Sequence, residues 1–147
     1  MQNRVDDIFA ERTRQELQRA QRYCLFLSVV VLDLSEFSRA VAKRSTDQKV
    51  DLESFIGQLE GGIKSTLRSS DIVTRCDSQR IALLLVETSK TGLDAVTERL
   101  QPFIVDSMKS QFEVPFEPRV QLDAASFPEE GDRFLTLIDQ FNGFSQS

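Results

Sequence analysis

Hydrophobic residues recur along the chain at two spacings, and the spacing predicts whether a segment is a helix or a strand. Residues 4–22 are rich in charge, and their apolar side chains follow a helical spacing: Val5, Ile8, Phe9, Leu17 and Ala20. We expect a mostly exposed helix there. Residues 24–34, in contrast, are almost uniformly apolar and rich in β-branched side chains. This run predicts a central strand buried on both faces, which Asp33 interrupts near its end.

The remaining helices and strands follow from the same periodicity. Helices are expected in four further segments: residues 35–45, 51–67, 91–109 and 132–141. The second of these has one apolar face, made by Leu52, Phe55, Ile56, Leu59, Ile63 and Leu67. Strands are expected in four further segments: residues 72–75, 81–86, 112–116 and 120–125. A polar loop is expected at 46–49, and a short polar turn at 76–80 joins two strands into a hairpin.

The order of these segments predicts the fold class. After the first helix the core order is β-α-β-β-α-β, the ferredoxin-like arrangement of an α+β domain. Such a core is an antiparallel sheet with helices on one face. Residues 1–22 then form an N-terminal helical extension, and residues 23–147 form a single domain.

The composition is that of an ordinary globular domain. The chain has 147 residues, 40% hydrophobic and 28% charged, with a net charge of -5. This length can bury a core, and the acidic balance gives no electrostatic reason to expect nucleic acid or an anionic membrane as a partner. The longest apolar run, 24–32, is too short to cross a bilayer. Two distant cysteines, Cys24 and Cys76, do not indicate a disulfide framework, so we expect a cytoplasmic location.

The residue types that are missing narrow the chemistry. The chain contains no histidine, which is the most common general base and zinc ligand. It also lacks the glycine-rich loops GxxxxGKS/T and GxGxxG that cradle phosphates. Any metal would have to be a hard cation held by carboxylates, and we expect no resident cofactor.

Four short motifs follow one another in a specific order. They are RAQR at 19–22, VVVLDLSEF at 29–37, RSSDIVTR at 68–75 and ASFPEEG at 125–131. In order and spacing they resemble the GGDEF domains of bacterial diguanylate cyclases, over nearly the whole chain. The resemblance implies the same nucleotide-cyclase-like βαββαβ fold. It also implies an activity that condenses two GTP molecules into cyclic di-GMP, with one GTP on each subunit of a dimer.

The metal-binding positions of that family are mostly changed in this chain. The resemblance places the first metal ligand on Asp33, which is retained, and the second acidic position on Ser35. The metal-binding acid of the signature loop falls on Gln79 and the next acid on Arg80. A magnesium–triphosphate site needs clustered carboxylates, because Mg²⁺ prefers hard oxygen ligands. A guanidinium within about 6 Å of Asp33 opposes a metal by Coulomb repulsion, so we expect no metal, no catalytic residue and no enzyme activity.

The nucleotide-binding positions are changed as well. Two glycines that let the loop approach the nucleotide fall on Asp77 and Ser78, which carry side chains. The guanine-binding asparagine of the family falls near Val41, and its C-terminal phosphate-binding lysine has no match. We interpret six positions as vestiges of an active site: Asp33, Ser35, Asp77, Ser78, Gln79 and Arg80.

One further motif of the family is intact. Arg68 and Asp71 form an R-x-x-D pair that ends five residues before the signature loop, where many such cyclases bind cyclic di-GMP and are inhibited. Arginine can read the O6/N7 edge of guanine or grip a phosphate, and aspartate can accept hydrogen bonds from guanine. The pair also has a local interpretation. Arg68 suits a helix end and Asp71 the following turn, where an i,i+3 ion pair contributes roughly a few tenths of a kcal/mol.

The sequence therefore supports a catalytically inactive GGDEF-like signalling domain with two alternative functions. One is a cyclic di-GMP receptor that uses residues 68–71, with residues 1–22 as a signalling or coupling helix. The other is a nucleotide-independent module for dimerisation or protein interaction, as a homodimer or with a protein partner. An active diguanylate cyclase is a third hypothesis, against which the lost carboxylates argue. Neither nucleic-acid binding nor membrane insertion is expected.

Overall fold

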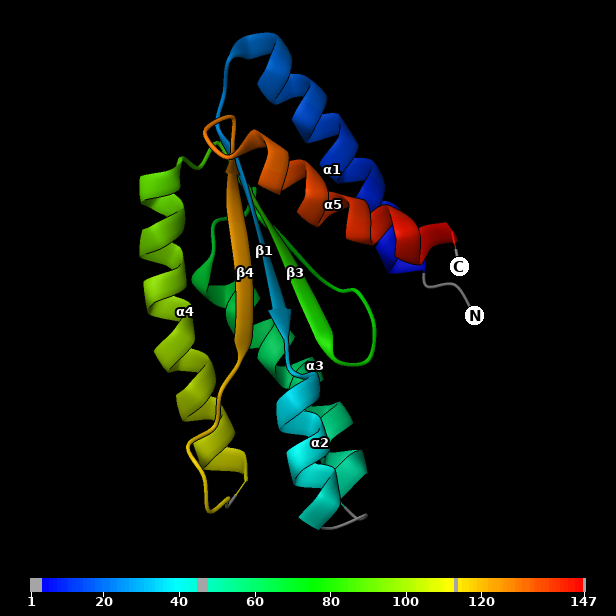
Figure 1. Ribbon diagram of the computed structural model, residues 1–147, viewed down its shortest axis with the longest axis vertical. Helices are drawn as coiled ribbons and strands as arrows, with labels where there is room; N and C mark the ends of the chain where they lie inside the picture. Colours follow the sequence, from blue (N-terminus) through cyan, green and yellow to red (C-terminus); the bar gives the residue numbers. More distant parts are fainter. Residues whose placement is uncertain (1–3, 45–47, 113, 147) are drawn as a thin grey trace.

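The structure is a computed structural model that describes residues 4–44, 48–112 and 114–146, which fold into five helices and a four-stranded sheet (Figure 1). In chain order the elements are α1 (Arg4–Tyr23), β1 (Leu27–Asp33), α2 (Ser35–Arg44), α3 (Gln48–Thr66), β2 (Ile72–Arg75), β3 (Arg80–Val86), α4 (Lys90–Gln111), β4 (Gln121–Phe127) and α5 (Gly131–Gln146). A βαββαβ core thus lies between α1 and α5, with α2 and α3 together forming its first crossover.

The sheet is antiparallel throughout and has the strand order β2-β3-β1-β4. β1 is a central strand, and its Val30 lies opposite Leu83 of β3 and Ala124 of β4. All of β1 except Asp33 is buried, which agrees with its uniformly apolar sequence. This arrangement confirms the predicted ferredoxin-like α+β class.

Both faces of the sheet are covered by helices. Alternate residues of a strand point to opposite faces, so Val30 and Leu32 pack with α2, α3 and α4, whereas Val29 and Val31 pack with α1 and α5. The prediction of helices on one face holds for the core helices α3 and α4 but not for the whole chain. The reason is that β1 and β3 are apolar on both faces and both faces must be kept from water.

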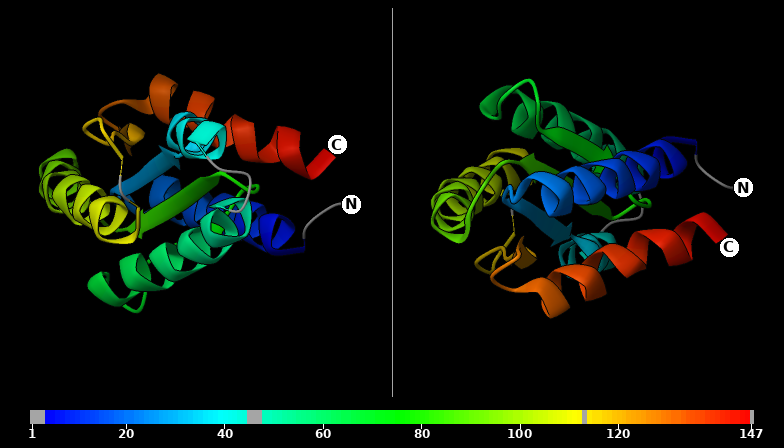
Figure 2. Two further views of the ribbon diagram at one scale, coloured as in Figure 1. Left: turned by 90° about the horizontal axis from the view of Figure 1, so that it is seen from below. Right: turned by 90° about the horizontal axis from the view of Figure 1, so that it is seen from above.

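The first helix packs into the second of these cores. Phe9, Ala10, Thr13 and Ala20 form its buried side, so α1 is less exposed than its charged sequence indicated. α1 and α5 run side by side, and the start of α1 lies near the end of α5, away from α4 (Figures 1 and 2). No helix within the described ranges is long and apolar enough to span a membrane. A signalling role for α1 stays a prediction.

The strand predicted at 112–116 is not found in the described residues of that segment, 112 and 114–116. α4 continues to Gln111, and Phe112 then ends the helix by donating its backbone N–H to Met108 O, at 3.0 Å. Its ring is buried edge-on against Phe37 and Phe55, at centroid distances of 5.7 and 5.4 Å. The apolar alternation of this segment therefore reflects one anchored ring followed by a loop whose Pro115 cannot donate to a ladder.

The polar loop predicted at 46–49 is also shorter than expected. α3 already begins at Gln48, so residues 48 and 49 are helical, while residues 45–47 lie outside the described residues. Polar residues are compatible with a first helical turn, because its backbone N–H groups have no partner within the helix.

A pair of neighbouring residues tests whether α1 belongs to the folded core. Phe9 is 1% exposed and Ile8 is 60% exposed. We expect Phe9→Ala to lower the free energy of unfolding by about 3 kcal/mol, because it leaves a cavity between α1 and α5. Ile8→Ala should change it by less than about 0.5 kcal/mol. Urea denaturation measures both, and equal losses in the two variants would show that α1 is not docked in solution.

Candidate functional site

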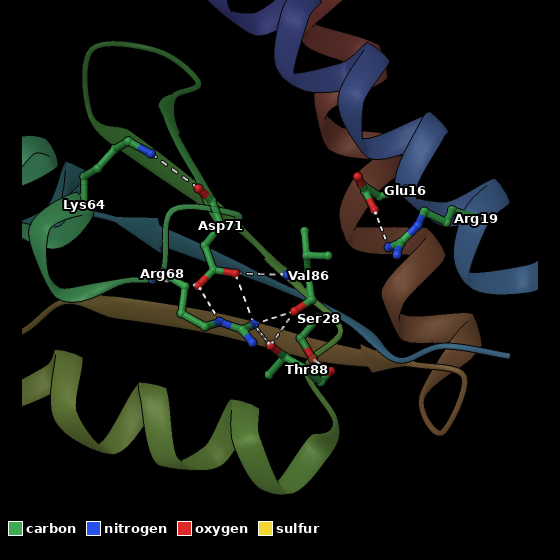
Figure 3. Close-up of polar contacts among 8 residues, drawn as sticks. All are labelled: Glu16, Arg19, Ser28, Lys64, Arg68, Asp71, Val86 and Thr88. Atoms are coloured by element: carbon green, nitrogen blue, oxygen red, sulfur yellow. Dashed lines mark hydrogen bonds and ion pairs between the residues drawn. The ribbon is translucent and has the colours of Figure 1, made fainter. Parts of the chain in front are cut away.

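Asp71 lies in the turn between α3 and β2, and its carboxylate is buried at 4% exposure. Oδ1 accepts hydrogen bonds from Arg68 Nη2 at 3.3 Å and from the backbone N–H of Val86 at 3.1 Å. Oδ2 accepts from the backbone N–H of Arg68 at 3.1 Å and from its Nε at 3.4 Å. Donors from the chain itself thus surround the carboxylate (Figure 3).

Arg68 is folded back onto Asp71 and reaches the end of β3. Its Nη2 also donates to Val86 O and, at 2.8 Å, to Thr88 Oγ1. The polar network continues to Ser28, whose Oγ bonds Thr88 O and the Oγ of Ser126, each at 2.7 Å. The pair therefore joins the α3–β2 turn to the start of α4, which is the local structural role that the sequence allowed.

Part of Arg68 nevertheless stays available. Its side chain is 57% exposed, and within the described part of the chain no hydrogen bond involves Nη1. Arg68 and Asp71 line a surface hollow of about 480 Å³ together with Thr88 and the exposed Arg99 of α4. Two guanidinium groups thus share one concave surface next to a fixed carboxylate.

The polar hairpin turn at 76–80 contains its own ion pair. The Asp77 carboxylate accepts from the backbone N–H of Gln79 and from Nε of Arg80, both at 2.9 Å. The turn is closed by the backbone N–H of Cys76, which donates to Arg80 O at 2.9 Å. Asp77 and Arg80, two of the positions that the resemblance marks as changed, therefore bind each other.

Asp33 also has partners within the protein. Its Oδ1 accepts from the backbone N–H of Ser35 at 2.9 Å, at the start of α2. Arg80 lies directly opposite Asp33 across β1 and β3, where facing Cβ atoms are about 5 Å apart. No group of three acidic or cysteine side chains within the described residues is placed to hold a metal. One carboxylate with a guanidinium opposite does not fit a magnesium–triphosphate site.

The six positions interpreted as vestiges of an active site lie where the end of β1 meets the hairpin turn, since the Leu34 backbone N–H donates to Gln79 O at 2.8 Å. Asp33 and Arg80 line a hollow of about 520 Å³ beside α5, with Asp123 and Arg133. Ser78 and Gln79 line another hollow, of about 400 Å³, with residues of α2 and α3. Arg75 holds the loop on that side, because Nη2 bonds the Glu53 carboxylate at 3.3 Å and Ser78 O at 3.2 Å.

The comparisons with known proteins identify the family. The family model described as "Diguanylate cyclase, GGDEF domain" matches residues 1–144. The chain belongs to the GGDEF family. No curated protein matches this GGDEF domain.

Solved GGDEF domains share its fold. The GGDEF domain of TpbB (YfiN) from Pseudomonas aeruginosa is 22% identical, with a TM-score of 0.67, over 96% of this chain and 89% of that one. DgcB of Caulobacter crescentus, solved in complex with c-di-GMP, is 12% identical, with a TM-score of 0.68, over 94% and 82%. SiaD of Pseudomonas aeruginosa, in complex with its activator SiaC, is 20% identical, with a TM-score of 0.63; the match covers 93% of this chain but 54% of SiaD. At these identities the likeness concerns the fold.

Sequence reasoning found the Arg68–Asp71 pair of this GGDEF domain but missed Arg99. Arg99 is separated from Arg68 by a hairpin and two turns of α4, and no local pattern distinguishes it from other exposed arginines. Only the packing of α4 beside the α3–β2 turn brings the two side chains to one hollow.

The buried carboxylate should contribute strongly to stability. Asp71→Ala removes the acceptor of the Val86 and Arg68 backbone N–H groups. We expect it to lower the free energy of unfolding by about 3 kcal/mol, since buried unpaired groups cost about 1 to 3 kcal/mol each. Asp77→Ala, which removes an exposed carboxylate of the hairpin turn, serves as the matched control and should cost less than about 1 kcal/mol. Chemical denaturation compares them, and similar losses would contradict the structural role of Asp71.

Proposed function

We propose that this GGDEF domain is a receptor for cyclic di-GMP that lacks cyclase activity, with its binding site in the hollow around Arg68 and Arg99. The observation that carries the proposal is the placement of two exposed guanidinium groups on one concave surface, one of them held by a buried carboxylate. Both cysteines are free, which suits a domain that works in the cytoplasm.

Arg68 and Asp71 have different roles in the proposed binding site. The Asp71 oxygens already accept four hydrogen bonds from the chain, so the carboxylate orients Arg68 rather than contacting the ligand. Holding a flexible arginine in place before binding reduces the entropy lost on binding. The Nη1 of Arg68, on a side chain that is 57% exposed, can then donate to guanine O6 or N7 or to a phosphate oxygen.

Arg99 supplies a second positive charge to the same hollow. Cyclic di-GMP carries two phosphodiester groups and two guanines, so a pair of arginines can contact one ligand molecule at two points. The complex of DgcB with c-di-GMP, a protein of the same fold, supports this choice of ligand.

Titration calorimetry with cyclic di-GMP tests the receptor. We expect Arg99→Ala to weaken binding at least tenfold while leaving stability unchanged, because within the described residues no hydrogen bond or ion pair of Arg99 is found. Charge-assisted hydrogen bonds contribute roughly 1.5 to 3 kcal/mol each, which corresponds to that loss. Arg39→Ala removes an exposed arginine at the other end of the sheet, beside Gln79, and should bind as the wild type does. No heat at high micromolar ligand, or equal affinities in all three proteins, would refute the proposal.

The absence of cyclase activity is part of the same proposal. With Mg²⁺ and GTP we expect no cyclic di-GMP, because Arg80 lies where a metal would need negative charge. Chromatography of the products measures this, with an established cyclase as the positive control. Magnesium-dependent turnover that is lost in Asp33→Ala would show the opposite.

A nucleotide-independent interaction module is the second candidate. The observation in its favour is that folding alone accounts for both members of the Arg68–Asp71 pair. SiaD, which has the same fold, was solved with the activator protein SiaC. If this second function is correct, we expect a stable homodimer or partner complex. Its mass, measured by light scattering, should be the same with and without cyclic di-GMP.

A further inference from the structure

Glu87 links the first helix to the hollow around Arg68. It follows β3 directly and lies between Val86 and Thr88, both of which bond Arg68. Its own carboxylate accepts a hydrogen bond from Nη2 of Arg19 on α1, at 3.2 Å. The same Glu87 lines the hollow with Arg68 and Arg99. One side chain thus contacts α1 and also contributes to the candidate binding surface.

The backbone holds Glu87 in this position. Its φ of 50° lies in the left-handed region, which residues other than glycine rarely adopt. The residues on either side are fixed, because the Val86 N–H is bonded to Asp71 and Ser28 Oγ donates to Thr88 O. The conformation persists because its surroundings determine it, and such strain is concentrated at functional positions.

Arg19 offsets the charge of Glu87, while Arg12 pairs with the neighbouring Glu16 at 3.6 Å. Glu16, one turn earlier on α1, holds the Arg19 guanidinium from the other side at 3.5 Å (Figure 3). The hydrogen bond to Glu87 also raises the pKa of Arg19 above its ordinary value. Without Arg19, a full negative charge would stand in a hollow that is otherwise suited to anions.

We infer that Glu87 is a positioning residue through which α1 controls ligand affinity. When α1 is docked, Arg19 neutralises Glu87 and the affinity for an anionic ligand is high. When α1 is displaced, the uncompensated charge of Glu87 lowers that affinity. This inference rests on the proposed function, because the ligand is the phosphodiester that Arg68 and Arg99 bind. Because the two equilibria are thermodynamically linked, a ligand that binds more tightly when α1 is docked must also stabilise the docked position of α1.

Calorimetry with cyclic di-GMP at low salt tests the coupling between α1 and the ligand, using substitutions that replace a charged side chain with neutral glutamine. Arg19→Gln should weaken cyclic di-GMP binding about threefold to fivefold, the range expected for one exposed ion pair. The same substitution in a Glu87→Gln background should change affinity by less than about 1.5-fold. Arg19→Lys, which keeps the charge, should restore wild-type affinity. Arg14→Gln removes an equal charge from another exposed pair on α1 and should have no effect.

Hydrogen exchange gives a second readout. Amides of residues 8–23 should exchange more slowly when the ligand is added to the wild type, and this protection should be lost in Glu87→Gln. Binding that is unaffected by Arg19→Gln, or an effect that persists without Glu87, overturns the coupling and leaves the receptor standing. No binding by the wild type overturns both.

Discussion

The rest of the structure depends on one buried carboxylate. Asp71 is withdrawn from water, and a buried charge is tolerated only where hydrogen-bond donors surround it. Those donors come from the preceding turn and from the end of β3, so satisfying Asp71 fixes how the α3–β2 turn meets the sheet. Arg68 extends the constraint through Thr88 to the start of α4. The R-x-x-D pair is therefore a folding element first, and any ligand uses an arginine that folding has already positioned.

The hairpin turn shows the complementary case, in which exposed or half-buried charges are paired within the protein. Asp33 faces Arg80 across the sheet and accepts a backbone hydrogen bond at the start of α2. Asp77 adds a carboxylate that holds Arg80. Both carboxylates therefore have a cation or a hydrogen-bond donor close by. The loop is neutral overall and is closed by its own hydrogen bonds.

The sequence predicted those parts of the fold whose cause is local. A uniformly apolar run indicated that β1 is central, and the polar turn at 76–80 indicated a hairpin. The alternation at 112–116 was misleading because Phe112 is buried by contacts with α2 and α3 that no local pattern encodes. The burial of α1 was underestimated, because its many charges hide a narrow apolar stripe around Phe9. Arg99 was missed for the same reason, since its place near Arg68 depends on how α4 packs.

The apolar character of both sheet faces explains why a charged first helix lies against the end of β3. β3 is apolar on both sides, so its second face needs the cover that α1 and α5 provide. Covering that face brings α1 to the end of β3, where Val86 and Thr88 hold Arg68. Between them the chain turns through Glu87 in a left-handed conformation, which places its carboxylate against Arg19. The contact between α1 and Glu87, which lines the Arg68 hollow, is therefore a consequence of burying β3. Any displacement of α1 exposes apolar surface and releases Glu87 in the same step.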